Sequence, residues 1–238
     1  MIKVVSRKKC LLLIAIALAL GAGTRPTADY FAAKTMDPML SVSDAVQRHV
    51  AIHEAGHSLV AYALNPKRLI GLHVITEHRQ SSAGLGLTNF TWTEGLATST
   101  EVFDLVAVLM GGMASEAVVA GDITIGNGDD LARANAILAQ ACGLKAMCGS
   151  LLVVNGGPAL EAMVQSHLLT AHFRARTILK AHIDVVKALA DEVMAQPAVN
   201  GQRSLNAEAL AKFFAAHPVP MVPPESRQIA PIVNEVSE

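Results

Sequence analysis

The chain has 238 residues, with 19 basic against 20 acidic side chains and a hydrophobic content of 52%. This length is enough to bury one substantial core, and the near-neutral charge gives no electrostatic reason to expect a nucleic-acid partner. Alanine, leucine and valine dominate the apolar residues, which suits packed helices.

The N-terminal segment, residues 1–35, has the pattern of a targeting sequence. Basic residues between Lys3 and Lys9 precede an uncharged apolar run at residues 10–23. That run is shorter than the roughly 20 residues that span a bilayer, and it matches the core of a signal peptide. A short uncleaved membrane anchor and a true start at Met36 are the alternatives. We expect a membrane-associated or exported protein of a bacterial-type envelope, with the side of the membrane left open.

A helix is predicted to begin near Ser41 and to end at Asn65. Ser41 and Asp44 form an S-x-x-D capping pattern, and apolar residues follow at helical spacing. Pro66 then stops the run, because proline cannot continue a helix interior.

The sequence His53-Glu54-Ala55-Gly56-His57 within this helix is an H-E-x-x-H pattern. Side chains four apart share one helix face, so His53 and His57 can offer two imidazole nitrogens to one metal ion. Glu54 lies beside that pair, where its carboxylate can take a proton from a water held by the ion. The alternative is an amphipathic helix with two partly exposed histidines and a solvated glutamate.

His49 extends the series of histidines but does not fit as a third ligand. Eight residues of helix rise about 12 Å, whereas zinc–nitrogen bonds are about 2 Å. We therefore expect His49 at the surface or behind the ligands, and a third ligand from elsewhere in the chain.

Two short β-prone runs follow, at residues 69–76 and 85–92, around a polar loop at residues 77–82. They predict a hairpin or small sheet. From the runs alone, a hairpin that covers the core is sufficient.

Acidic residues that could complete a metal site lie further along the chain. Glu116 falls in a second predicted helix, opened by the capping box Thr98-x-x-Glu101. Asp129 and Asp130 open a third predicted helix at residues 131–141. A solvated helix glutamate and aspartates favoured by the helix dipole are the alternatives.

The remaining sequence is predicted to be scaffold. Helical patterns cover residues 158–196 and 204–216, and a proline-rich tail at residues 217–238 is expected to be disordered. The histidines of the long helix, His167 among them, are assigned no role.

Cysteine usage leaves the compartment open. Cys142 and Cys148 can pair if the protein is exported, or can lie reduced and buried. Neither has a CxxC partner, which disfavours a second zinc site.

Several ordered segments resemble the FtsH-type ATP-dependent metalloproteases. The stretch from His49 to Tyr62 is similar to the zinc helix of that family, and Gly86-Leu87-Thr88 follows in order. The similarity continues through residues 107–112 with Glu116, and through residues 126–134. It extends over roughly residues 41–215.

The resemblance implies a role for each matching residue. His53, His57 and Asp130 would be the ligands of a Zn²⁺ ion, Glu54 the general base, and Glu116 a supporting residue beside the site. The family places an ATPase module before its peptidase domain, but this sequence contains no G-x-x-x-x-G-K-[ST] motif. Departures at Met113 and Asp129, where the family usually carries arginine and asparagine, touch none of the proposed ligands.

We therefore expect a mainly α zinc-metallopeptidase domain at residues 36–216, with a small β hairpin or sheet near the active site. The resemblance implies that the edge of this sheet could hold an extended peptide by main-chain hydrogen bonds. The expected activity is hydrolysis of peptide bonds in unfolded or flexible polypeptides. The alternatives are a catalytically silent relative that binds peptides or regulates a protease, and a helical membrane-associated protein with a chance motif. Self-association and an ATPase partner are compatible with the resemblance.

Overall fold

The computed structural model describes residues 39–79, 84–91, 97–144, 147–148 and 156–223. The predicted targeting segment, residues 1–35, lies outside the described residues, as do residues 224–238 of the predicted tail.

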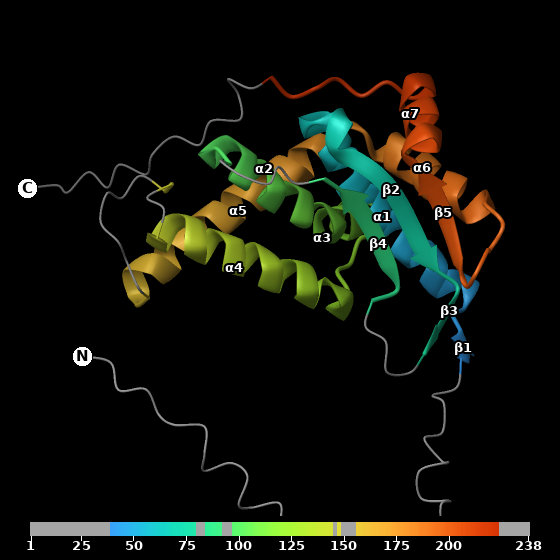
Figure 1. Ribbon diagram of the computed structural model, residues 1–238, viewed down its shortest axis with the longest axis horizontal. Coiled ribbons are helices and arrows are strands. Elements are labelled where there is room, and N and C mark those ends of the chain that lie inside the picture. The colour runs from blue at the N-terminus through green and yellow to red at the C-terminus, as the bar shows by residue number, and fades with distance from the viewer. Residues whose placement is uncertain (1–38, 80–83, 92–96, 145–146, 149–155, 224–238) are drawn as a thin grey trace, which may run out of the picture. The chain divides into compact units, whose positions relative to one another are not determined.

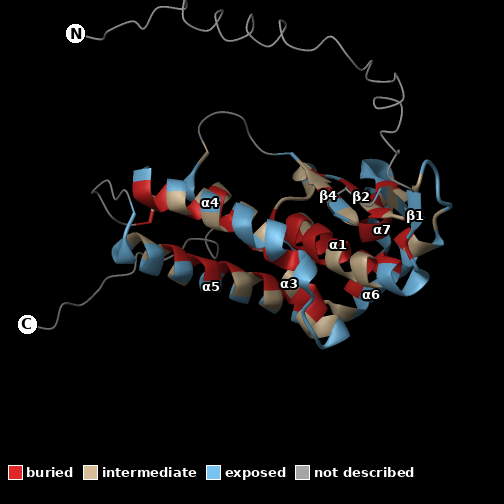
Figure 2. Ribbon diagram, turned by 90° about the horizontal axis from the view of Figure 1, so that it is seen from below, coloured by how far each residue is buried: buried red, intermediate tan, exposed pale blue. Residues whose placement is uncertain are grey.

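A long helix, α1 (Asp44–Leu64), occupies the centre of the fold. It packs against β2 and β4 on one side and against α3 and α6 on others (Figure 1). Its second half is almost wholly buried, including His57, Ser58 and Leu59, and Figure 2 shows it red between its neighbours. The H-E-x-x-H residues are therefore held by tertiary packing on several sides.

The small sheet is antiparallel, with the strand order β4 (Gly86–Phe90), β2 (Leu69–Ile75), β5 (Gln202–Asn206). A separate pair joins β1 (Met39–Ser41) to β3 (Glu77–Arg79). The hairpin predicted from the two β-prone runs is thus confirmed, and β4 is an edge strand of the described sheet.

Helices make up most of the described chain, which confirms the mainly α fold class. Apart from α1 they are α2 (Ser99–Leu109), α3 (Gly111–Ser115), α4 (Gly128–Leu144), α5 (Pro158–Ala181), α6 (Ile183–Ala195) and α7 (Ala207–Ala216), with a π-helical turn at Glu116–Ala120 and 3₁₀ turns at Pro66–Arg68 and Ile125–Asn127.

The C-terminal part of the described chain packs onto α1. Tyr62 stacks on Phe214 of α7 with ring centroids 3.9 Å apart. Beyond α7, at the start of the predicted tail, Val219 is buried and the amide of Val222 donates to the carbonyl of Ala63 at 2.9 Å.

Three predicted boundaries were wrong because strand pairing outweighs local pattern. The N-cap of α1 is Ser43, whose hydroxyl accepts from the amide of Val46, whereas Ser41 pairs with Glu77 in β1–β3. Residues 77–79, predicted as loop, are the other strand of that pair. Ser204 and its neighbours lie in β5 opposite His73, not in a helix.

Two predicted helices are interrupted. The pattern over residues 158–196 divides at His182, whose φ of −138° and ψ of 36° leave the helical region between α5 and α6. The helix predicted around Glu116 is divided between α2, α3 and the π turn, which ends at Gly121 with φ of 81°. The predicted capping box of Thr98 and Glu101 is confirmed.

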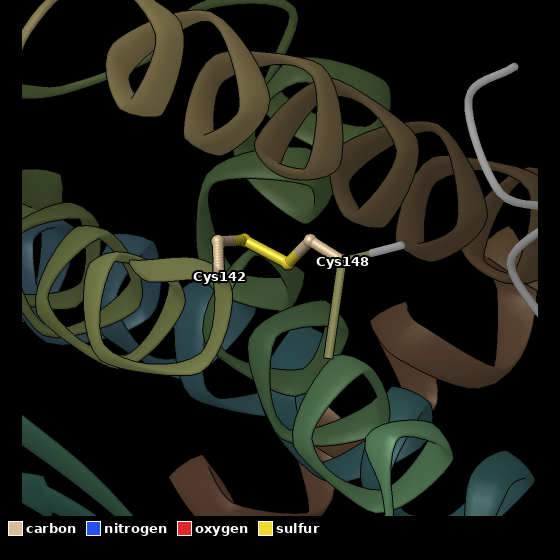
Figure 3. The surroundings of a disulfide bond; sticks show 2 residues. All are labelled: Cys142 and Cys148. Carbon is tan, nitrogen blue, oxygen red and sulfur yellow. A yellow bond between two sulfur atoms is a disulfide. The ribbon is translucent and has the colours of Figure 1, made fainter. Parts of the chain in front are cut away.

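The cysteines left open by the sequence form a disulfide between Cys142 and Cys148 (Figure 3). Among the described residues no single helix has the length and apolar character of a membrane span. The bent pair Ser99–Leu109 and Gly111–Ala120 meets that description when taken together, by length and composition.

Glycines allow α1 and α3 to cross at close range. A Cβ added at Gly56 would lie 2.4 Å from the Ser115 hydroxyl and 2.5 Å from the Gly111 carbonyl oxygen. A Cβ at Gly111 would lie 2.9 Å from the Gly56 carbonyl oxygen. Any side chain at Gly56 or Gly111 must therefore push the two helices apart.

We predict that Gly56→Ala lowers the free energy of unfolding by about 1–3 kcal/mol, because overpacking forces backbone shifts. Urea unfolding at a fixed metal concentration measures the change. Gly128→Ala is the matched control, since Gly128 is helical and nothing lies within 4 Å of an added Cβ. That control should be neutral or stabilising by up to about 1 kcal/mol. Equal stability of the Gly56→Ala variant and the wild type would contradict the close crossing.

Candidate metal centre

Three predicted ligands from two helices meet at one point. Nε2 of His53 and Nε2 of His57 are 2.9 Å apart, on one face of α1. Oδ2 of Asp130, in the first turn of α4, lies 3.2 Å from the first nitrogen and 3.0 Å from the second. Donors bound tetrahedrally to one ion at bonds of about 2.0–2.1 Å would be about 3.3 Å apart, so the spacing fits a zinc-sized cation.

The second nitrogen of each imidazole is occupied by an oxygen acceptor. Nδ1 of His57 lies 2.7 Å from the carbonyl oxygen of Val108, and Nδ1 of His53 lies 2.6 Å from Oε1 of Glu116. A carbonyl oxygen only accepts, so Nδ1 of His57 carries the proton; the longer 3.2 Å approach of the Gly112 amide is secondary. The Nε2 lone pairs are thereby directed toward Asp130, an arrangement that requires a cation or a proton between them.

Glu116 is the buried carboxylate behind His53. It is 1% exposed, and its Oε2 accepts from the Thr124 amide at 2.6 Å and from Nδ2 of Asn127 at 3.1 Å. Burial alone would raise its pKa, but the hydrogen bonds from His53, Thr124 and Asn127 lower the pKa to about 2. Glu116 is therefore ionised at neutral pH and fixes the ring of His53. Nε2 of His49 lies 3.4 Å from Glu116 Oε2, behind the ligands as expected.

The acidic surroundings of His53 favour positive charge. Burial would lower its pKa, yet the hydrogen bonds to Asp130 and Glu116 outweigh burial and raise the pKa to about 9. The pKa of Asp130 is held below its usual range by His53 and His57, against the opposing effect of burial. The same negative field would favour a divalent cation between these groups.

Gly112 of α3 leaves the space that an ion needs. A Cβ at this position would lie 2.3 Å from Nε2 of His53 and 2.5 Å from Nε2 of His57. The backbone of α3 thus forms one wall of the centre, and a side chain would cover the ligand atoms.

Glu54 is held beside the three donors by strand β4. The carboxylate is buried, and its Oε2 accepts from the Thr88 hydroxyl at 2.7 Å. The other side of the carboxylate faces Gly86, where an added Cβ would lie 2.5 Å from Oε1. Thr88 and Gly86 therefore fix the Glu54 carboxylate against β4, in the lining of the same cavity as the three donors.

A cavity of about 850 Å³ opens onto these groups. The cavity is lined by Glu54, His53, His57 and Asp130 and by residues 84–88 of the β4 region. The rest of the lining combines apolar side chains with polar ones: Ala45, Val46, Val50, Phe90, Leu109 and Ile125, and His49, Glu116, Thr124, Asp129 and Arg133. The centre is therefore reachable by a ligand as large as a peptide segment.

The fold and these side chains define the class: a mainly α metallopeptidase domain with an H-E-x-x-H helix and an aspartate from a second helix. Residues 40–155 match peptidase family M41. The chain carries a peptidase domain of the FtsH type.

Similar proteins bear names of the same kind. The ATP-dependent zinc metalloprotease FtsH 2 of Sphaerobacter thermophilus is 29% identical over 177 residues, 67% of this chain and 26% of that protein. FtsH of Methylibium petroleiphilum is 30% identical over 209 residues, 77% of this chain and 33% of that protein. FtsH of Kosmotoga olearia is 39% identical over 87 residues, 36% of this chain and 13% of that protein. The chain thus spans at most about a third of the length of these relatives.

Sequence reasoning did not foresee several residues that shape the centre. Asn127 lies in a segment noted only for its resemblance, yet its side chain donates to Glu116. Thr88 and Gly112 lay in segments noted for their resemblance, without any role. No pattern in the sequence marks the carbonyl of Val108, because its contact with His57 exists only once α2 lies against α1.

We predict that Glu116→Gln lowers zinc affinity about 10–100-fold, because the amide removes the charge that orients His53 and supports it as a donor. Competition with a chromogenic chelator gives the affinity. Glu161→Gln, an exposed position in the first turn of α5, should leave it unchanged. Equal affinities in all three proteins would show that Glu116 does not support the centre.

We further predict that Gly112→Ala abolishes stoichiometric zinc binding, because the methyl group would occupy the space in front of both Nε2 atoms. Metal analysis of the purified variant measures this. Gly126→Ala is the control in the same cavity, since its Cβ would meet only the Thr124 hydroxyl oxygen at an ordinary 3.5 Å. Full zinc occupancy in Gly112→Ala would place the metal elsewhere.

Proposed function

We propose that this chain is a zinc metalloendopeptidase that hydrolyses peptide bonds of unfolded or flexible polypeptides. The proposal rests on one observation: His53, His57 and Asp130 converge beside the buried carboxylate of Glu54, in the lining of an open cavity. We assign the first three as the zinc ligands and Glu54 as the catalytic general base. The M41 match supports the assignment of metal and reaction class.

A zinc ion bound there would act as a Lewis acid, polarising a substrate carbonyl and lowering the pKa of a water to about 7. The residues of the chain supply the remaining requirements. Glu54 accepts a proton from the attacking water and afterwards delivers it to the leaving amine. Thr88 holds the carboxylate in place through its 2.7 Å hydrogen bond, so that both transfers use one position.

Strand β4 supports an extended substrate. Its outer edge is unpaired within the described sheet, and the strand lines the cavity next to Glu54. A polypeptide that adds to this edge would form main-chain hydrogen bonds whatever its sequence, which suits flexible chains of varied composition. The apolar walls would receive its side chains.

The cellular setting is part of the proposal. We place the chain at the membrane or outside the cytoplasm, supported by the pattern of residues 1–35 and by the Cys142–Cys148 bond, since disulfides persist in oxidising compartments. The names of the relatives link the peptidase to ATP. If the domain lies on the cytoplasmic side of the membrane, an ATPase partner would unfold substrates for it, and outside the cytoplasm it would cut polypeptides that are already unfolded. Self-association is compatible with both locations. The N-terminal residue of the mature protein and the fraction that contains it test the location.

We predict that Glu54→Gln lowers the rate of casein hydrolysis about 10²–10⁴-fold while zinc stays bound, because the amide cannot accept the proton. The rate and the zinc content are measured on the same preparation, with Glu77→Gln on β3 as the control that keeps full activity. Chelation should abolish wild-type activity, and zinc should restore it.

Each of the other possible results would support a different interpretation of the chain. Full activity in Glu54→Gln would remove the assignment of the base. A wild-type protein that binds zinc and peptides without hydrolysis would be the catalytically silent relative. A protein without stoichiometric zinc would make the H-E-x-x-H pattern accidental.

A further inference from the structure

A second group of metal-binding side chains lies away from the cavity, where α4, α5 and α2 meet. Cys142 near the end of α4, Cys148 beyond it and His167 of α5 place two sulfurs and a ring nitrogen within 4.8 Å of one another. Figure 3 shows the two cysteines joined between the surrounding helices. None of the three lines the catalytic cavity.

His167 is the unusual member of this group. Its side chain is 2% exposed, and among the described residues neither ring nitrogen has a hydrogen-bond partner. Phe103 of α2 stacks on one face with ring centroids 4.8 Å apart, which fills space but satisfies no nitrogen. A buried imidazole in this state lacks a partner that a metal ion would provide.

Burial lowers the pKa of His167, so its imidazole is neutral and has a lone pair for an ion. Both cysteines are buried as well, Cys142 completely and Cys148 to all but 8%. One Zn²⁺ with two thiolates and a neutral imidazole has zero net charge. Such a set can lie in the core without the cost of an unpaired buried charge.

We propose that Cys142, Cys148 and His167 form a second zinc site when the disulfide is reduced, so that disulfide and metal exclude each other at this place. A fourth coordination position is left to a small ligand from solution. The distances require a modest adjustment, because sulfurs bound to one zinc ion lie about 3.8 Å apart at bonds of about 2.3 Å.

A backbone hydrogen bond beside Cys148 would keep the cysteines close after reduction. The Met147 amide donates to the Ala141 carbonyl at 3.1 Å, which fastens the residue before Cys148 to the last turn of α4. The Cα atoms of Cys142 and Cys148 are 4.8 Å apart. The backbone therefore holds Cys142 and Cys148 close together, independently of the disulfide bond between them.

The reduction of the disulfide uses a dithiol as the reductant. The dithiol gives two electrons and two protons to the Cys142–Cys148 bond, which breaks into two thiols while the reductant becomes a disulfide. Zinc then replaces the thiol protons, which pass to solvent, and accepts one lone pair from each sulfur and one from the imidazole.

The test compares the zinc content of the full chain in its oxidised and dithiol-reduced forms. We expect the reduced form to bind one additional equivalent, whatever the catalytic centre holds, so the result stands apart from the proposed peptidase function. With Co²⁺ as the probe, the reduced form should show thiolate-to-metal charge-transfer absorption, which a centre of two imidazoles and a carboxylate cannot give.

His167→Phe is the matched variant, because phenylalanine keeps the stacking on Phe103 and leaves the disulfide possible. It should weaken the additional site more than about tenfold, since loss of a ligand exceeds the usual cost of losing a supporting residue. His172→Gln, on the same helix but outside the group, should bind the additional equivalent as the wild type does.

Two results would overturn the proposal: a reduced, folded wild type without additional zinc, and equal additional binding in His167→Phe. If reduction alone unfolds the chain, zinc added beforehand should preserve the helical circular dichroism of the wild type and not that of Cys142→Ser/Cys148→Ser. Equal loss of that signal in both would also overturn it.

Discussion

The close crossing of α1 and α3 is the constraint on which the rest of the structure depends. Gly56 and Gly111 bring the two backbones into contact. Because of that contact, the chain that follows α3 places Glu116 under His53, and the end of α2 places a carbonyl against His57. A wider crossing would leave both imidazoles on an exposed helix face with free rotation.

The candidate metal centre places negatively charged carboxylates around a site that favours positive charge. Asp130, Glu116 and Glu54 bring carboxylates to a buried place where unpaired charge is costly. The hydrogen bonds to Asp130 and Glu116 outweigh burial and raise the pKa of His53 to about 9, so the surrounding carboxylates favour positive charge at this place. The same charges would favour a bound cation.

Local geometry made part of this centre predictable. Two histidines four apart must share a helix face, and a capping box such as that of Thr98 acts within one turn. Asp130 was different, because an aspartate in a first helical turn is common for reasons of the helix dipole; the family resemblance, not the spacing, singled it out. Contacts across the fold, such as Thr88 with Glu54, depend on strand packing that no local pattern contains. Sheet pairing also explains why Ser41 and Ser204 lie in strands despite helical signals around them.

The hydrogen bond from Thr88 to Glu54 joins strand β4 to the H-E-x-x-H helix, and the register of the sheet controls it. Thr88 pairs with Leu72 of β2, and alternate residues of a strand point to opposite faces. A slip of one residue would present Leu87 or Asn89 to the carboxylate. An insertion inside β4 would turn Thr88 to the other face of the sheet and remove its hydrogen bond to the Glu54 carboxylate. The register of β4 on β2 therefore sets the position of that carboxylate.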